Sequence, residues 1–135
     1  MKKLFSTKYS AGAFSAAMLA LRLGAGILIM KHGYEKLIHF ESMHDHFMNF
    51  MGIGSSLSMA LVIFAEFLCG LFIVLGLFTR LACLPLIVAM SVALFKAHNA
   101  DFFGKGEIPA LYLTCFIVLL LVGPGRASVD GMSGK

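Results

Sequence analysis

Four apolar segments make up most of this chain, and their lengths constrain its fold more than any other feature. They run over about residues 12–38, 57–78, 81–98 and 108–124. A helix needs about 20 mainly apolar residues to cross a bilayer, and 59% of the 135 residues are hydrophobic while only 13% are charged. We therefore predict a single all-α domain over residues 1–135, an integral membrane four-helix bundle that runs up and down through the lipid bilayer.

The segment between the first and second spans, residues 39–56, is more polar than its neighbours. Within it Met43, Phe47, Met48, Phe50 and Met51 recur at spacings that give a short helix one apolar side. Such a helix is suited to the surface of a membrane. We expect a short interfacial helix between spans 1 and 2.

Basic residues are distributed unevenly between the two ends of such a bundle. With an even number of spans, one side carries Lys2, Lys3, Lys8, Arg80, Arg126 and Lys135, and the other carries Lys36, Lys96 and Lys105, with Lys31 near its boundary. The positive-inside rule then places both termini in the cytoplasm. The net charge of +4 is scattered, without a basic run interleaved with aromatics, so we expect no binding of nucleic acid.

Arg22 and Glu66 each lie about halfway along an apolar segment. A charged side chain at that depth costs roughly 2.5 to 3.5 kcal/mol, and counting residues from the span ends puts both about 14 to 15 Å deep. We predict that they form an ion pair. Two interpretations stay open: the pair only fixes the register of the helices, or it marks a substrate, quinone or proton site.

Helical phase adds further residues to this region. At 100° per residue, Arg22, Gly26, Gly33 and Lys36 share one stripe of the first helix, with His32 at its edge. Glycines on such a stripe allow close approach of a neighbouring helix. His32 lies about 15 Å from Arg22 towards the outer face, at the level expected for Lys36 and the residues before the last span. The candidate ligand-binding residues are Arg22, His32, Lys36, Glu66 and His98.

Metal-binding and nucleophilic residues give weaker signals. Cys69, Cys83 and Cys115 fall one per apolar segment without a C-x-x-C pair, so we expect buried, small apolar side chains rather than metal ligands. A zinc or haem site that uses His32, His98 and the loop residues His44 and His46, helped by Asp45 and Asp101, is an alternative, but the histidines lack H-x-x-x-H spacing. There is no G-x-S-x-G motif, so we assign neither a metal site nor a catalytic residue and leave enzymatic activity open.

Several short motifs together resemble the DoxX family of small bacterial membrane proteins. They are Arg22-Leu23 with Gly26, His32-Gly33, Lys36-Leu37, Glu66-Phe67 with Gly70, Gly76-Leu77, Thr79-Arg80-Leu81-Ala82, Gly123-Pro124-Gly125 and Ser128-Val129-Asp130. The resemblance covers about residues 20–130 and implies a four-helix fold in the bacterial cytoplasmic (inner) membrane. It also implies a loose link to redox metabolism, because the family name comes from a subunit of a thiosulfate:quinone oxidoreductase. The same five polar positions carry over, whereas Cys69 departs from the Gly of many relatives.

The leading functional hypothesis is a quinone-linked or redox-associated membrane subunit that binds a small amphiphile at an interior polar site. No redox cofactor is visible in the sequence, so a quinone is the candidate ligand and electron transfer would need a redox partner subunit. A homo-oligomer is compatible with this hypothesis. Two alternatives stay open. One is a small proton-coupled transporter, although the sequence shows no inverted repeat of the kind that many transporters carry. The other is a membrane scaffold that tethers soluble redox enzymes.

Overall fold

The computed structural model describes residues 2–45, 47, 49, 52–97, 101 and 103–133. Over these residues it contains helices and no strand, which confirms the all-α prediction. The elements are η1 (Lys2–Phe5), α1 (Ala11–Ile38), α2 (Phe40–Met43), α3 (Ser55–Ile63), η2 (Phe64–Cys69), α4 (Gly70–Leu75), α5 (Thr79–Val92), η3 (Ala93–Ala97), α6 (Glu107–Val122) and α7 (Val129–Met132).

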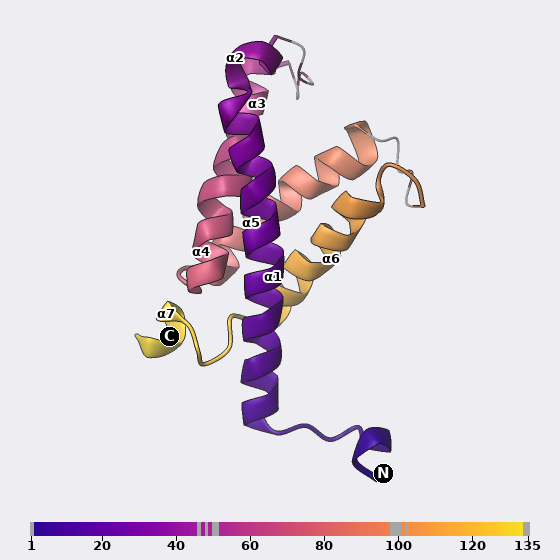
Figure 1. Cartoon of the computed structure of the whole chain (residues 1–135), viewed down its shortest axis with the longest axis vertical. Coiled ribbons are helices and arrows are strands. Elements are labelled where there is room, and N and C mark those ends of the chain that lie inside the picture. Colours follow the sequence, from indigo (N-terminus) through magenta and orange to yellow (C-terminus); the bar gives the residue numbers. More distant parts are fainter. Residues whose placement is uncertain are drawn as a thin grey trace.

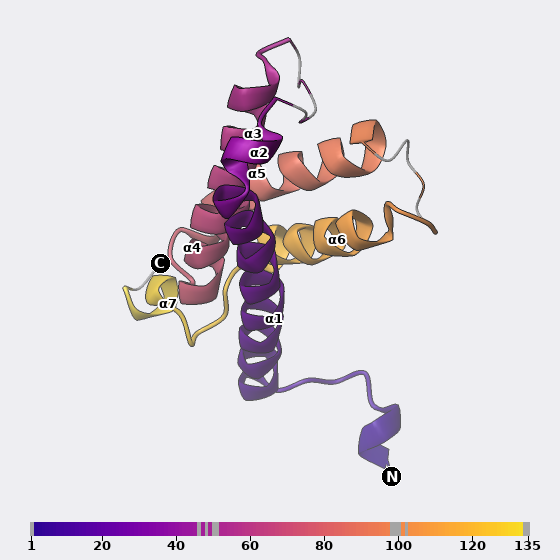
Figure 2. The same cartoon turned by 45° about the horizontal axis from the view of Figure 1, so that its top comes forward.

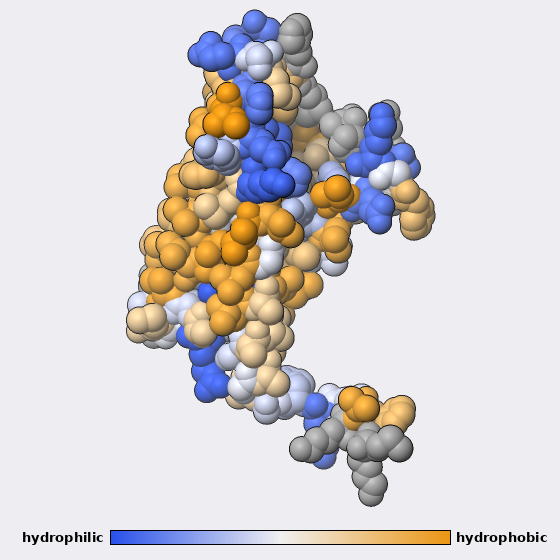
Figure 3. All heavy atoms as spheres, in the orientation of Figure 1, coloured by the Kyte–Doolittle hydropathy of each residue, from blue (hydrophilic) through white to orange (hydrophobic). Residues whose placement is uncertain are grey.

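Two helical stretches are long and apolar enough to cross a membrane. They are α1, with 28 residues, and the continuous stretch Ser55–Leu75 formed by α3, η2 and α4, with 21 residues. The stretches Thr79–Phe95 and Glu107–Val122 are apolar but shorter. Figure 3 shows a hydrophobic band across the middle of the molecule, with hydrophilic residues above and below it, as expected for a surface that contacts lipid.

The helices pack in two groups that share one interior. α1 packs along η2 and α4, and α5 packs against α6 and η2. In Figure 1, α1 stands upright beside the α3–α4 stretch, while α5 and α6 incline away from it together, and Figure 2 shows the same arrangement from another direction. Both termini lie at the end of the molecule that carries the α4–α5 turn, and α2 lies at the opposite end (Figure 1).

Glycines bring the first helix close to its neighbour, as predicted from helical phase. A Cβ built at Gly26 would lie 3.1 Å from the carbonyl oxygen of Gly70, and one built at Gly33 would lie 2.7 Å from the amide nitrogen of Phe67. These backbones therefore approach more closely than any side chain would allow.

The interior is filled by apolar side chains and two of the cysteines. Ile73, Leu86 and Phe116 are fully buried, and Cys69 and Cys83 are buried among them. The prediction for these two cysteines is confirmed, whereas Cys115 is only partly buried.

The connection after α1 contains a single helical turn, α2, at Phe40–Met43. The ring of Phe40 stacks on His44, with centroids 5.1 Å apart. This turn begins earlier in the chain than the expected interfacial helix. Three apolar residues of that expected helix, Met48, Phe50 and Met51, lie outside the described residues.

Candidate functional site

Glu66 forms an ion pair with Lys36 in the interior of the protein. Lys36 Nζ on α1 donates a hydrogen bond to Glu66 Oε1 on η2 over 2.5 Å, and the Glu66 side chain is only 5% exposed. The predicted pair between Arg22 and Glu66 is therefore wrong. A carboxylate this deeply buried needs a compensating charge, and Lys36 supplies it.

Local backbone geometry explains why these two residues meet. η2 is a single π-helical turn inside an otherwise α-helical stretch, a feature that is frequent at functional sites. Because Gly33 has no side chain, the η2 backbone at Glu66 and Phe67 lies directly against α1. Lys36 follows Gly33 by about one helical turn, so its side chain projects beside Glu66.

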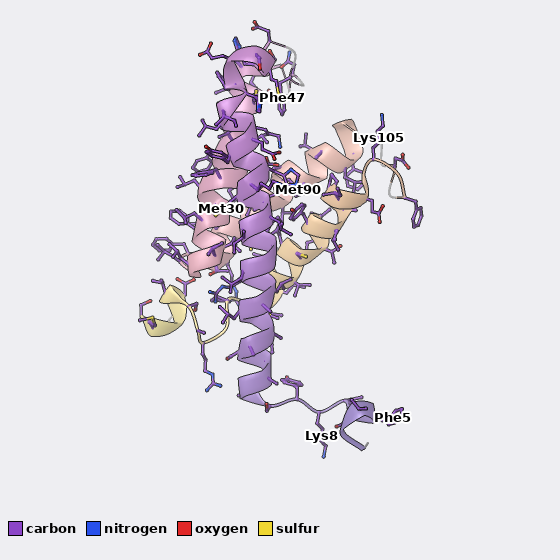
Figure 4. All side chains as sticks on the ribbon, viewed as in Figure 1. Phe5, Lys8, Met30, Phe47, Met90 and Lys105 are labelled. Carbon is purple, nitrogen blue, oxygen red and sulfur yellow. The ribbon has the colours of Figure 1, made fainter. Side chains whose placement is uncertain are left out.

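A cavity of about 490 Å³ opens beside this ion pair. Its walls come from α1, the α3–η2 stretch, α5 with η3, and α6, so residues distant in sequence meet there. Its lining residues are Ile29, His32, Lys36, Phe47, Val62, Glu66, Ala89, Met90, Val92, Ala93, Lys105, Ile108, Pro109 and Tyr112. In Figure 4, Met90 lies near the middle of the molecule, whereas Phe47 and Lys105 lie nearer the end that carries α2.

His32 and Tyr112 form the other polar wall of the cavity. The His32 ring meets the Tyr112 ring edge to face, with centroids 5.9 Å apart. Tyr112 in turn stacks on the buried ring of Phe116, with centroids 6.0 Å apart. The cavity thus combines two ammonium groups, a carboxylate, an imidazole and a phenol with walls that are mainly aliphatic.

Arg22 occupies a separate and closed environment. Its guanidinium donates hydrogen bonds of 2.8 to 3.1 Å to the carbonyl oxygens of Ile73, Val74, Pro124 and Ala127, and the residue is 2% exposed. The carbonyls of Ile73 and Val74 lie at the end of α4, where a helix leaves its last acceptors without partners. The positive charge also suits the negative end of the helix dipole.

The predicted pairing of Arg22 with Glu66 fails for a geometric reason. Its partners lie at the end of α4 and after the end of α6, so Arg22 lies at one end of the packed helices. Figure 1 shows that the first turns of α1 continue beyond α4 and α6. Counting residues from the start of the apolar segment therefore does not give the level of Arg22 relative to the neighbouring helices.

The C-terminal segment docks on the α4–α5 turn beside Arg22. Asp130 accepts hydrogen bonds from the N–H groups of Phe78 and Thr79, both at 2.9 Å, and so caps the first turn of α5. Gly76 has a φ of 71°, and a Cβ built there would lie within 3.0 Å of the Arg22 guanidinium carbon. The Ser128-Val129-Asp130 motif and Gly76 thus have structural roles that sequence reasoning missed.

The structure brings together three of the five predicted site residues, His32, Lys36 and Glu66. Arg22 lies apart from them, and His98 lies outside the described residues. In the part of the chain that the structure describes, no group of three or more His, Cys, Asp or Glu residues is placed to hold a metal ion. His44 contacts Ser56 and Asp45 in an exposed connection, and His46 is outside the described residues.

Sequence reasoning missed two polar residues of the cavity, Tyr112 and Lys105. Tyr112 had a usable signal, since it lies about one turn into the last apolar segment. His32 lies at a comparable distance from the end of the first segment. Lys105 precedes the last apolar segment, and its distance from the cavity depends on the direction in which α6 inclines.

Comparison with known proteins places this architecture in a family. The family model described as DoxX matches residues 17–99. The chain belongs to the DoxX family. Among curated proteins it is similar to the uncharacterized membrane protein Rv3486 of Mycobacterium tuberculosis, with 27% identity over 88% of this chain and 82% of that protein. No solved structure matches the chain.

This DoxX protein is thus a membrane protein with apolar helices, and the resemblance noted from its motifs is confirmed. The matched region contains His32, Lys36 and Glu66. It ends before Tyr112 on α6, which completes the cavity, and before Asp130, which caps α5.

Proposed function

We propose that this DoxX protein is a quinone-linked or redox-associated membrane subunit that binds a small amphiphile in the cavity between α1, η2, α5 and α6. The observation that carries the proposal is the Lys36–Glu66 ion pair, which borders a cavity with mainly apolar walls. A cavity of about 490 Å³ falls in the range of small-molecule sites, roughly 300 to 1,000 Å³.

The lining groups match the chemistry of a quinone headgroup. The Lys36 ammonium and the Tyr112 hydroxyl donate hydrogen bonds to carbonyl oxygens, and a neutral His32 can donate from one ring nitrogen. Glu66 holds the Lys36 ammonium in place and is the nearest proton-accepting group. Ile29, Val62 and Met90 supply apolar contacts for the ring and its side chain.

The electrons for redox chemistry would come from a partner subunit in this proposal. The role of this chain is to bind the headgroup, orient its oxygens and exclude water around them. Reduction of a quinone also takes up protons, for which Glu66, His32 and Tyr112 are the available acid–base groups at the cavity.

The proposal includes four membrane crossings in the bacterial inner membrane, with both termini in the cytoplasm. It is supported by the shared position of the termini and the α4–α5 turn. The shorter helices α5 and α6 also expose apolar side chains, such as Leu84 and Leu111, as lipid-facing helices do.

Impermeant thiol labelling of intact cells, after replacement of the native cysteines, checks this topology at positions 3, 105 and 133. Labelling at 105 alone is expected, and labelling at 3 or 133 would contradict it.

Binding is tested by following the melting of the detergent-purified protein during titration with ubiquinone and menaquinone analogues. A ligand that binds only the folded state raises the melting temperature by mass action. The control is a molecule with the same side chain but a hydrocarbon ring that lacks both carbonyl oxygens. A shift specific to the quinones supports the proposal. No shift, or an equal shift with the control, would contradict it.

A further inference from the structure

A second cavity, of about 820 Å³, lies at the end of the molecule that carries the termini. It is built by the start of α1, the first turn of α5 and the tail after α6, so it is separate from the Lys36–Glu66 cavity. We refer to it as the arginine pocket, and the lining residues that matter here are Phe14, Ser15, Thr79, Arg80, Leu81 and Arg126.

The fold brings two arginines together in this pocket. Arg80 projects from the first turn of α5 and lies against the tail, where its guanidinium would be 3.3 Å from a Cβ built at Gly123. Arg126 comes from the tail itself, and its Nε donates a hydrogen bond to Ser15 Oγ over 3.1 Å. Among the described residues, neither arginine has a carboxylate within ion-pair distance.

An unpartnered hydroxyl lies in the same lining. Thr79 is fully buried, and its Oγ1 has no hydrogen-bond partner within the described part of the chain. Buried polar groups are nearly always hydrogen-bonded, so this hydroxyl is an exception within the lining. The backbone N–H of Thr79 is already used by Asp130.

Asp130 also lines the pocket. Its two carboxylate oxygens accept the N–H groups of Phe78 and Thr79, and the nearby Arg22 guanidinium interacts favourably with it. Arg80 and Arg126 are both exposed and keep their own charges available for a ligand.

We propose that the arginine pocket binds the phosphate headgroup of an anionic phospholipid. Arginine matches phosphate because its planar fork donates two parallel hydrogen bonds. Apolar side chains that continue from the pocket, Phe14 and the exposed Leu81, give the acyl chains a surface to follow. In the proposed topology this end of the molecule faces the cytoplasmic leaflet, where anionic headgroups lie.

The test uses the full chain in neutral detergent, with phosphatidylglycerol, phosphatidylcholine or inorganic phosphate as the added probe. Melting curves report stabilisation, and native mass spectrometry reports the number of lipids retained. Phosphatidylglycerol is expected to raise the melting temperature while phosphatidylcholine does not. Arg80→Gln and Arg126→Gln should each weaken the apparent affinity for phosphatidylglycerol about fivefold.

Lys8→Gln is the matched control, because Lys8 lies on the segment before α1 at the same end of the molecule (Figure 4) but does not line the pocket. It should change the affinity by less than about twofold if the effect is local to the pocket. Equal stabilisation by both lipids, an equal effect of Lys8→Gln, or full stabilisation by inorganic phosphate alone would overturn the lipid assignment.

Discussion

Arg22 and Lys36 are cations on the same face of α1, but their surroundings differ. Arg22 is enclosed, and its guanidinium donates to four backbone carbonyls from two separate parts of the chain, the end of α4 and the segment after α6. Lys36 makes one ion pair, keeps 26% of its side chain exposed, and borders a cavity. A buried charge whose hydrogen bonds are all used holds helices together, whereas one that retains donors beside an empty volume can bind a ligand.

The largest effect expected from this comparison is on stability at Arg22. Arg22→Leu removes the guanidinium that donates to four carbonyl oxygens, and loss of such a network costs about 3 to 5 kcal/mol. Thermal melting in detergent measures the loss. Lys31→Gln is the control, because Lys31 is exposed and only 4.0 Å from Glu35 in a surface ion pair, which contributes little. Equal melting temperatures of the two variants would contradict the structural role of Arg22.

A double-mutant cycle separates the two possible partners of Glu66. Lys36→Met and Glu66→Met should show a coupling of about 1 to 3 kcal/mol, because each single change leaves a charge without its partner. Arg22→Leu combined with Glu66→Met should be additive within about 0.5 kcal/mol. Free energies of unfolding from denaturant titrations provide the measurement. Coupling of Glu66 to Arg22 but not to Lys36 would contradict the assignment of Lys36 as the partner of Glu66.

A smaller effect is expected at the helix contact that aligns Lys36 with Glu66. Gly33→Ala places a methyl group 2.7 Å from the Phe67 amide nitrogen, and such overpacking costs about 1 to 3 kcal/mol. Gly24→Ala is the matched control on the same helix, since nothing lies within 4 Å of its Cβ position. That control should be neutral or stabilising by up to about 1 kcal/mol. Similar melting temperatures for both variants would argue against close packing at Gly33.

Part of this site follows from the sequence. The period of the first helix placed Gly26, Gly33 and Lys36 on one stripe, and the structure uses that stripe against η2 and α4. The apolar segments likewise predicted the positions of the main helices, although α3 begins at Ser55 and α6 at Glu107.

The residues that Arg22 and Glu66 contact could not be predicted from the sequence, because these contacts depend on non-local geometry. The position of Arg22 depends on how far α1 extends beyond its neighbours, and the direction of Glu66 depends on the π-helical turn of η2. Neither feature has a periodic signal in the sequence. Asp130 caps a helix that begins about 50 residues earlier, so its role appears only after the tail has docked.

The central claim, that the Lys36 cavity binds a quinone-like amphiphile, is tested most directly by comparing two lysines of one helix. Equilibrium binding of a ubiquinone analogue is measured for the wild type, Lys36→Gln and Lys31→Gln in the same detergent. Loss of a charged hydrogen-bond donor at the site should weaken binding at least about tenfold in Lys36→Gln. Lys31→Gln should bind within about twofold of the wild type. Equal affinities for all three proteins would contradict the account.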